Sequence, residues 1–220
     1  MNTKYRQKIL ELTKKYYNKL DKEDFSHNSD HFFRVENLAK RIAKDEKADV
    51  EVIEAASLLF DVARDLEDKG EIKDHAEEGA EIAKEILNKI DFPKEKIEKV
   101  CGAILAHRNS GNIEPKTLEA KILRDADYLD AMGAINVVRV IASSLQSQKY
   151  RRPIFIDKSY EDKDSVGHIS AYHFMLYQVN NPKHQPENFY TKLGKRFAKD
   201  RFKFSKEYVE RFIDEWHGER

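Results

Sequence analysis

The stretch that decides the fold is residues 50–65, which reads VEVIEAASLLFDVARD. Its apolar side chains fall on almost every side of a helix drawn through it, and such a helix belongs inside a core. Asp49 stands directly before it and is a good helix N-cap residue. We therefore predict a central buried helix over residues 50–65, with the carboxylate of Asp61 inside an apolar segment.

The rest of the chain shows the same helical pattern. Gly and Pro are scarce, and apolar residues recur at spacings of three and four. No strand pattern and no internal repeat is found, so the predicted fold class is all-α, a single-domain helical bundle over residues 1–220. A region without periodicity, 146–164, is long enough for a lid or a binding role. Besides 50–65, the predicted helices span residues 3–20, 30–47, 73–90, 93–107, 117–145, 165–179 and 187–216.

Composition excludes several classes of protein. Lys and Arg number 40 against 40 Asp and Glu, so there is no strong basic field for general nucleic-acid binding. Hydrophobic residues make up 40%, more than disordered chains carry. Cys101 stands alone and cannot staple a secreted fold. No stretch is apolar enough for a membrane span, and the first residues are polar, so we expect a cytoplasmic protein without a membrane or sequence-specific nucleic-acid partner.

Buried acids are the first sign of chemistry. Asp61 lies among apolar residues, and Asp125, Asp127 and Asp130 lie at spacings of two and three in a core-like helix. A buried carboxylate is costly unless it is paired or bound to a cation. One interpretation is that Arg34 or Arg124 neutralises these acids in buried ion pairs. The other is a metal ion.

Three histidines supply the other half of a candidate site. His31 and His75 stand near the starts of predicted helices, and His107 ends one. Imidazole and carboxylate together suit a divalent transition metal, and such ligands can come from neighbouring helices of a bundle. Each histidine by itself is more often a packing or helix-end residue, so the hypothesis depends on the set.

The set resembles the HD-domain metal-dependent phosphohydrolases, whose signature is a His, a His-Asp pair and a distant Asp. The matching segments are His31-Phe32-Phe33-Arg34-Val35, Leu58-Leu59-Phe60-Asp61 and Asp125-Ala126-Asp127-Tyr128-Leu129-Asp130-Ala131. Segments around His75, His107, Phe189 and Trp216 are also similar to the small single-domain members. The resemblance implies a metal-site core at about 25–135, with C-terminal helices at about 165–217 packing on it.

The resemblance also implies an activity and roles. We expect hydrolysis of a phosphoester or phosphoanhydride of a phosphorylated small molecule, most simply a nucleotide, with a divalent ion such as Mn, Ni, Mg, Fe or Zn; a homodimer is left open. The implied metal ligands are His31, Asp61 and Asp125, and the implied catalytic residues are Asp61, His75 and His107. Asp127 and Asp130 are expected to orient the ligands, and Arg34, Arg151 and Arg152 to bind substrate.

One departure from the family pattern affects the functional prediction. The His of the His-Asp pair is Phe60 in this chain, and a phenyl ring cannot ligate a metal. Three explanations stay open at this point: a natural variant that binds metal weakly or through another ligand, a protein that binds a nucleotide without turnover, and an engineered substitution.

Overall fold

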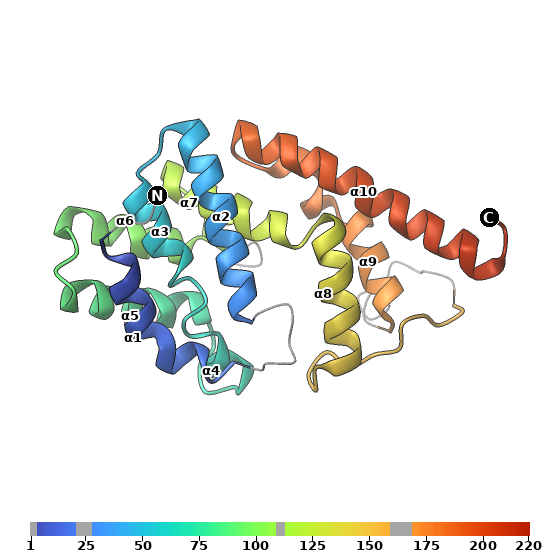
Figure 1. Cartoon of the computed structure of the whole chain (residues 1–220), viewed down its shortest axis with the longest axis horizontal. Helices are drawn as coiled ribbons and strands as arrows, with labels where there is room; N and C mark the ends of the chain where they lie inside the picture. Colours follow the sequence, from blue (N-terminus) through green and yellow to red (C-terminus); the bar gives the residue numbers. More distant parts are fainter. Residues whose placement is uncertain (1–3, 21–27, 109–112, 159–168) are drawn as a thin grey trace. The chain divides into compact units, whose positions relative to one another are not determined.

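A computed structural model describes residues 4–20, 28–108, 113–158 and 169–220 (Figure 1). These residues form α-helices, short 3-10 turns and connections, with no strand among them. The all-α prediction is therefore confirmed. The chain divides into two compact units, which are described separately below. The expectation of one domain stays a prediction.

Unit 1 comprises residues 1–21, 27–127 and 190–194. Within it, α3 packs against α1, α2 and α6, and α5 packs against α1, α4 and α6. Side-chain caps fix several helix starts: Asn28 caps α2, Asp49 caps α3 and Asp74 caps α5. Its helices are α1 (Arg6–Tyr17), α2 (Ser29–Glu46), α3 (Val50–Ser57), α4 (Arg64–Asp68), α5 (His75–Lys89), α6 (Lys94–Leu105) and the larger part of α7 (Leu118–Asp130).

The central helix is buried as predicted but shorter than predicted. Residues 52–57 of α3 are all buried, yet the helix ends at Ser57, and residues 58–63 form consecutive turns before α4. The hydroxyl of Tyr17, from α1, donates a hydrogen bond to the carbonyl of Leu58. On the other side Gly79 of α5 packs on the carbonyl of Phe60, where an added Cβ would come within 3.4 Å. Asp61 therefore lies in a buried turn and not on a helix.

Unit 2 comprises residues 22–26, 128–189 and 195–220. Its described helices are α8 (Gly133–Gln146), α9 (Ala171–Asn180) and most of α10 (Lys192–His217), with the 3-10 turns η2 (Pro182–His184) and η3 (Pro186–Asn188). The core joins Val140 of α8, Met175 of α9 and Val209 of α10. Phe155, from the segment before α9, packs its ring against that of Trp216 in a tilted arrangement, with 4.7 Å between centroids.

Two predictions of helix and loop boundaries fall in this part of the chain. The helix expected over 117–145 is interrupted at residues 131–132, and α8 begins at Gly133, which has a φ of +77°; glycine adopts this left-handed conformation without strain. Of the predicted loop 146–164, residues 147–158 are non-helical, and 159–164 lie outside the described residues. The predicted helix start at 165 also lies outside them.

Within the described part of the chain, no single helix has both the length and the apolar composition needed to cross a membrane. The consecutive helices α7 and α8 meet these two criteria only when they are taken together across their break.

Candidate metal centre

Three side chains of unit 1 converge on one point. Asp61 comes from the turn after α3, His75 is the first residue of α5, and His107 follows the end of α6. All three are almost fully buried. Oδ1 of Asp61 lies 3.1 Å from Nε2 of His75 and 3.6 Å from Nε2 of His107, and the two Nε2 atoms are 3.2 Å apart. Sequence reasoning named these three residues, and the structure brings them together.

The opposite ring nitrogens show which atoms carry protons. Nδ1 of His107 lies 2.6 Å from the carbonyl oxygen of Ile104, and Nδ1 of His75 contacts a carboxylate oxygen of Glu67. Because neither partner can donate, both Nδ1 atoms must carry the hydrogen. In the neutral rings the Nε2 lone pairs then face each other and the carboxylate of Asp61. Three electron-pair donors at one point require a cation or an added proton between them.

The pKa shifts of Asp61 and His75 also favour a positive charge at this point. Burial opposes ionisation of Asp61, but its contacts with His107 and His75 outweigh burial and hold the pKa of Asp61 well below its usual range. Burial likewise opposes protonation of His75, but the carboxylate of Asp61 outweighs it and raises the pKa of His75. Asp61 is thus an anion, and a positive charge is stabilised beside it.

The donor set fits a divalent transition metal. Ligand atoms about 2.0–2.2 Å from a tetrahedral ion lie about 3.3–3.6 Å apart, close to the three separations in this cluster. The contact between Glu67 and His75 is of the carboxylate–histidine kind that orients metal-ligating histidines. Among the described residues, Asp61, His75 and His107 offer ligand atoms within 4.8 Å of one another.

Phe60 lies beside this cluster, with its ring next to both His31 and His107. Its buried ring contacts His31 edge-on at 5.6 Å and His107 at 5.1 Å between centroids. His31 lies on the other side, with Nε2 3.8 Å from Oδ2 of Asp61 and 3.4 Å from Oδ1 of Asp127. The two oxygens of Asp61 therefore face different histidines.

Asp125 is buried and hydrogen-bonded to residues 190–191. Its carboxylate accepts hydrogen bonds from the backbone N–H of Tyr190, the N–H of Thr191 at 2.8 Å and the hydroxyl of Thr191 at 2.7 Å. These contacts tie α7 to residues 190–194 within unit 1. His31 contacts Asp127, which the sequence had placed in a supporting role; metal ligation by Asp125 stays a prediction.

Arg124 does not neutralise the buried acids of α7. Its guanidinium donates to the carbonyl of Ala106 at 2.7 Å, to that of Arg108 at 3.1 Å and to that of Ile113 at 2.5 Å. The first two carbonyls flank His107. Arg124 therefore holds the segment that carries His107, and the interpretation that it pairs with the acids is wrong.

The other predicted residues are distributed over both units. Arg34 is half-buried on α2, one helical turn after His31. Asp130 is buried in unit 2 and pairs with Arg139 at 2.6 Å. Arg151 is exposed, whereas Arg152 stacks on the ring of Phe174 at 4.7 Å. The structure therefore shows a packing contact for Arg152, and the substrate-binding roles of the three arginines stay predictions.

Sequence reasoning missed Glu67 and gave no role to Arg108. Glu67 accepts a hydrogen bond from the backbone N–H of His75 at 2.8 Å and also contacts Nδ1 of the His75 ring. Arg108 donates a hydrogen bond to Glu67 at 3.0 Å. Arg108 directly follows His107, which was a usable signal. Glu67 is one of several acids between residues 65 and 71, and no spacing distinguishes it from the others.

Known proteins are similar to this chain in sequence and in fold. The HD domain family model matches residues 28–132. A solved structure from an uncultured Thermotogales bacterium, named a predicted HD superfamily hydrolase, is 31% identical, with a TM-score of 0.68 over 96% of this chain and 93% of the other. The chain belongs to the HD superfamily. This HD domain contains Asp61, His75 and His107, while all of α10 lies beyond the matched range.

YpgQ of Bacillus subtilis is a further relative of this HD protein. It is 32% identical over 128 residues, a match that spans 54% of this chain and 58% of YpgQ. A crystal structure of YpgQ in complex with ADP has a TM-score of 0.66 over 96% of each chain, at 21% identity. At that identity the second comparison shows the shared fold.

Proposed function

We propose that this chain is a metal-dependent phosphohydrolase of the HD superfamily, acting on a phosphoester or phosphoanhydride of a nucleotide. The observation that carries the proposal is the convergence of Asp61 Oδ1, His75 Nε2 and His107 Nε2. The complex of YpgQ with ADP supports a nucleotide as the ligand class.

The proposed ligand set differs from the one implied by the family motif. Asp61, His75 and His107 would hold the ion, because Phe60 replaces the histidine that would link His31 to this cluster. On the side of Asp61 that faces His31, Asp127 joins Asp125 as a proposed carboxylate ligand, because Oδ1 of Asp127 lies 3.4 Å from Nε2 of His31. A bound divalent ion would polarise the phosphate oxygens and an attacking water.

The residues around the ion have separate proposed tasks. Glu67 fixes the ring of His75, so that its Nε2 faces Asp61. Arg108 lies next to Glu67 and is 22% exposed, so its guanidinium is available to a phosphate at the edge of the cluster. Arg34, one turn after His31, is the second proposed substrate contact.

A second candidate function is nucleotide binding without turnover. The observation that favours it is Phe60, since the ring fills the position of a nitrogen ligand. Turnover distinguishes the two functions, because binding alone leaves the nucleotide intact.

The experiment is metal analysis and hydrolysis of ADP with added Mn²⁺. The protein is expected to bind about one ion per chain, and Asp61→Asn is expected to lower Mn²⁺ affinity at least tenfold and to abolish hydrolysis. Asp68→Asn is the matched control, because Asp68 is an exposed acid seven residues later and should change neither. Equal Mn²⁺ affinity in the protein and in Asp61→Asn would refute the proposed site.

Glu67→Gln tests whether Glu67 orients the ring of His75 for metal binding. It keeps the shape of the side chain but weakens the acceptor of the His75 ring proton, so a loss of about tenfold to a hundredfold in Mn²⁺ affinity is expected. Calorimetric titration with Mn²⁺ measures it, with the exposed Glu71→Gln as control. An unchanged affinity would mean that Glu67 does not orient a ligand.

A further inference from the structure

The long helix α10 carries its charges in two separate halves. Residues 195–206 contain six cations and one acid, whereas residues 207–217 contain four acids and one cation. Both halves belong to unit 2, and Figure 1 shows them as parts of one continuous helix. The sign of the charge therefore changes along α10 between Lys206 and Glu207.

Charged residues of both halves share one face of the helix. Residues three and four apart follow one another along a helix, because a turn takes 3.6 residues. This spacing joins Lys199, Lys203, Lys206, Glu210 and Asp214. The first four are exposed and Asp214 is half-buried. The face is therefore a stripe that is positive in its first half and negative in its second.

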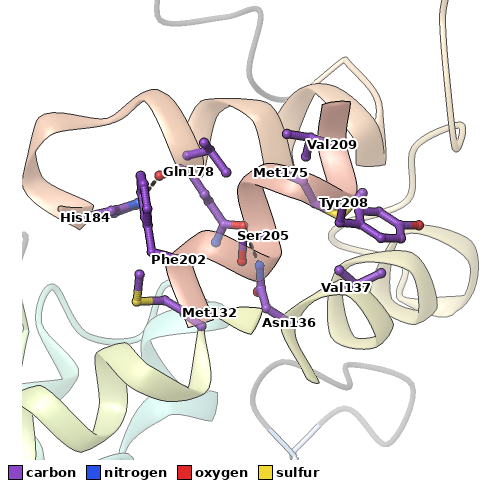
Figure 2. Close-up of a pocket in the computed structure, with 12 residues that line it drawn as sticks. Met132, Asn136, Val137, Met175, Gln178, His184, Phe202, Ser205, Tyr208 and Val209 are labelled. Atoms are coloured by element: carbon purple, nitrogen blue, oxygen red, sulfur yellow. Dashed lines mark hydrogen bonds between the residues drawn. The ribbon is translucent and has the colours of Figure 1, made fainter. Parts of the chain in front are cut away.

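The opposite side of α10 packs within unit 2. Phe202, Ser205 and Val209 line a small hollow together with residues of α8 and α9 (Figure 2). Val209 also shares a buried cluster with Val140 of α8 and Met175 of α9. Because these residues hold α10 in the core of unit 2, its charged stripe points away from that core.

Helix stability does not account for this order of charges. The helix dipole favours acids near the N-terminus and cations near the C-terminus, yet α10 has no acid in its first turn. The pairs within the stripe are exposed and long, with 3.7 Å between Lys203 and Glu207 and 3.9 Å between Lys206 and Glu210. Such pairs contribute little, so the side chains remain available to groups outside the helix.

We propose that this stripe is an interaction surface for the same stripe of a second copy of the chain, with the two α10 helices antiparallel. A two-fold axis at the boundary between the halves brings the positive half of each helix against the negative half of the other. A parallel pair would place like charges together. The antiparallel pairs are Lys206 with Glu207 of the second copy, Lys203 with its Glu210 and Lys199 with its Asp214.

Charge pairs of this kind predict a weak dimer. Each exposed pair contributes little and is screened by salt, although the two-fold axis repeats all three pairs. We therefore expect a dimer that forms at high protein concentration and low ionic strength. The proposal depends on α10 alone and does not rest on the proposed hydrolysis.

The first experiment is sedimentation equilibrium of the full chain over a range of protein concentrations. The dissociation constant of the dimer is expected to be at least tenfold higher in about 500 mM NaCl than in about 20 mM NaCl, because the Debye length shortens. A chain that stays monomeric in low salt at about 1 mM protein would overturn the proposal.

Charge reversal tests the pairing itself. Lys203→Glu places two acids at the contact with Glu210 of the second copy, and Glu210→Lys places two lysines there, so each should raise the dissociation constant about tenfold or more. Both substitutions in one chain restore the pair with its signs exchanged and should return the constant to within about threefold of the wild type. Lys89→Glu, an exposed reversal on α5, is the matched control and should change it less than about twofold.

Recovery in the double variant can arise only between two copies. Within one helix that variant keeps two acids at positions 203 and 207 and two lysines at positions 206 and 210, so it repairs no contact of the helix itself. Circular dichroism measures the helix content of each variant. If Lys203→Glu lowers the helix content, Lys199→Glu with Asp214→Lys tests the next pair by the same cycle.

Three further results would overturn the proposal. The first is a dimer whose dissociation constant is unchanged by both single reversals, and the second is a double variant as weak as the single ones. The third is a monomer that binds a single-stranded oligonucleotide and loses it with Lys203→Glu, which would assign the positive half of the stripe to a nucleic acid.

Discussion

At the scale of single residues, Phe60 decides what the cluster can do. Its phenyl ring fills the space between His31 and His107 and supplies no ligand atom. Asp61 therefore shares one oxygen with His75 and His107 and turns the other towards His31. Asp61 is thus the residue that contacts all three histidines.

Phe60→His should restore the missing nitrogen. An imidazole at this position would lie between His31 and His107 and beside Asp61, so Mn²⁺ affinity is expected to rise at least tenfold, with faster hydrolysis of ADP. Without metal, replacing the buried ring by a polar one should lower the free energy of unfolding by about 1–3 kcal/mol. Metal content after dialysis and calorimetric titration are the measurements.

Phe32→His is the control for this change. Phe32 is also buried, and its ring lies 5.8 Å from that of Phe60 between centroids. Unlike Phe60, it does not directly precede Asp61 in the sequence. It should lose stability without gaining metal. If Phe60→His binds Mn²⁺ no more tightly than the wild type, the position is not a ligand position in this protein; if hydrolysis occurs only in Phe60→His, the wild type is the binding protein.

At the scale of elements, α7 holds together the parts of unit 1 that surround the site. Arg124 fixes the segment around His107 through three carbonyls, and Asp125 fixes residues 190–191. Adjacent residues of one helix thus anchor two connections that are distant in the sequence. Gly194 permits this, because its missing side chain leaves room for Asp125 and Thr191.

Gly194→Ala should disrupt that anchor. A Cβ at this position would come within 2.4 Å of Oδ2 of Asp125 and 2.6 Å of the hydroxyl of Thr191, so a loss of about 1–3 kcal/mol in the free energy of unfolding is expected. Gly102→Ala on α6 is the contrast: nothing lies within 4 Å of its Cβ, and alanine should stabilise the helix by about 0.5–1 kcal/mol. Urea denaturation measures both, and an equal effect of the two substitutions would contradict the anchor.

At the scale of the whole molecule, buried ion pairs connect helices far apart in sequence. Glu36 of α2 accepts from Arg6 of α1 at 2.8 Å and from Lys40 at 2.8 Å, and Lys40 also contacts Glu54 of α3. Burial opposes ionisation of Glu36, but the two cations outweigh it and lower its pKa. Unit 1 therefore includes a charge network whose strength depends on pH.

This network should make stability fall in acid. Because the pKa of Glu36 is lower in the folded than in the unfolded protein, its contribution is present above the unfolded value of about 4.3 and is lost as pH falls through the folded value. Glu36→Gln should cost about 1–3 kcal/mol at pH 7 and progressively less below about pH 4. Denaturant titrations at several pH values measure the difference; the exposed Glu85→Gln should show no such trend.

The sequence by itself determined the fold class and the family. These inferences depend on local features, which a sequence shows directly: helical periodicity, the apolar segment of α3 and the motifs around His31, Asp61 and His107. The sequence points to Asp61 because a carboxylate in an apolar segment is an anomaly, whereas His75 and His107 are candidates only as part of a set with the acids and through the family resemblance.

Only the tertiary structure decided which donors meet. The end of α3 at Ser57 depends on Tyr17 and Gly79 from other helices, and the contacts of Asp125 with Thr191 and of Glu67 with His75 cross between elements. Sequence spacing alone cannot tell which of two nearby acids on one helix, such as Asp125 and Asp127, contacts a given partner. What distinguishes them is the direction of each side chain and the group it meets, and tertiary packing sets both.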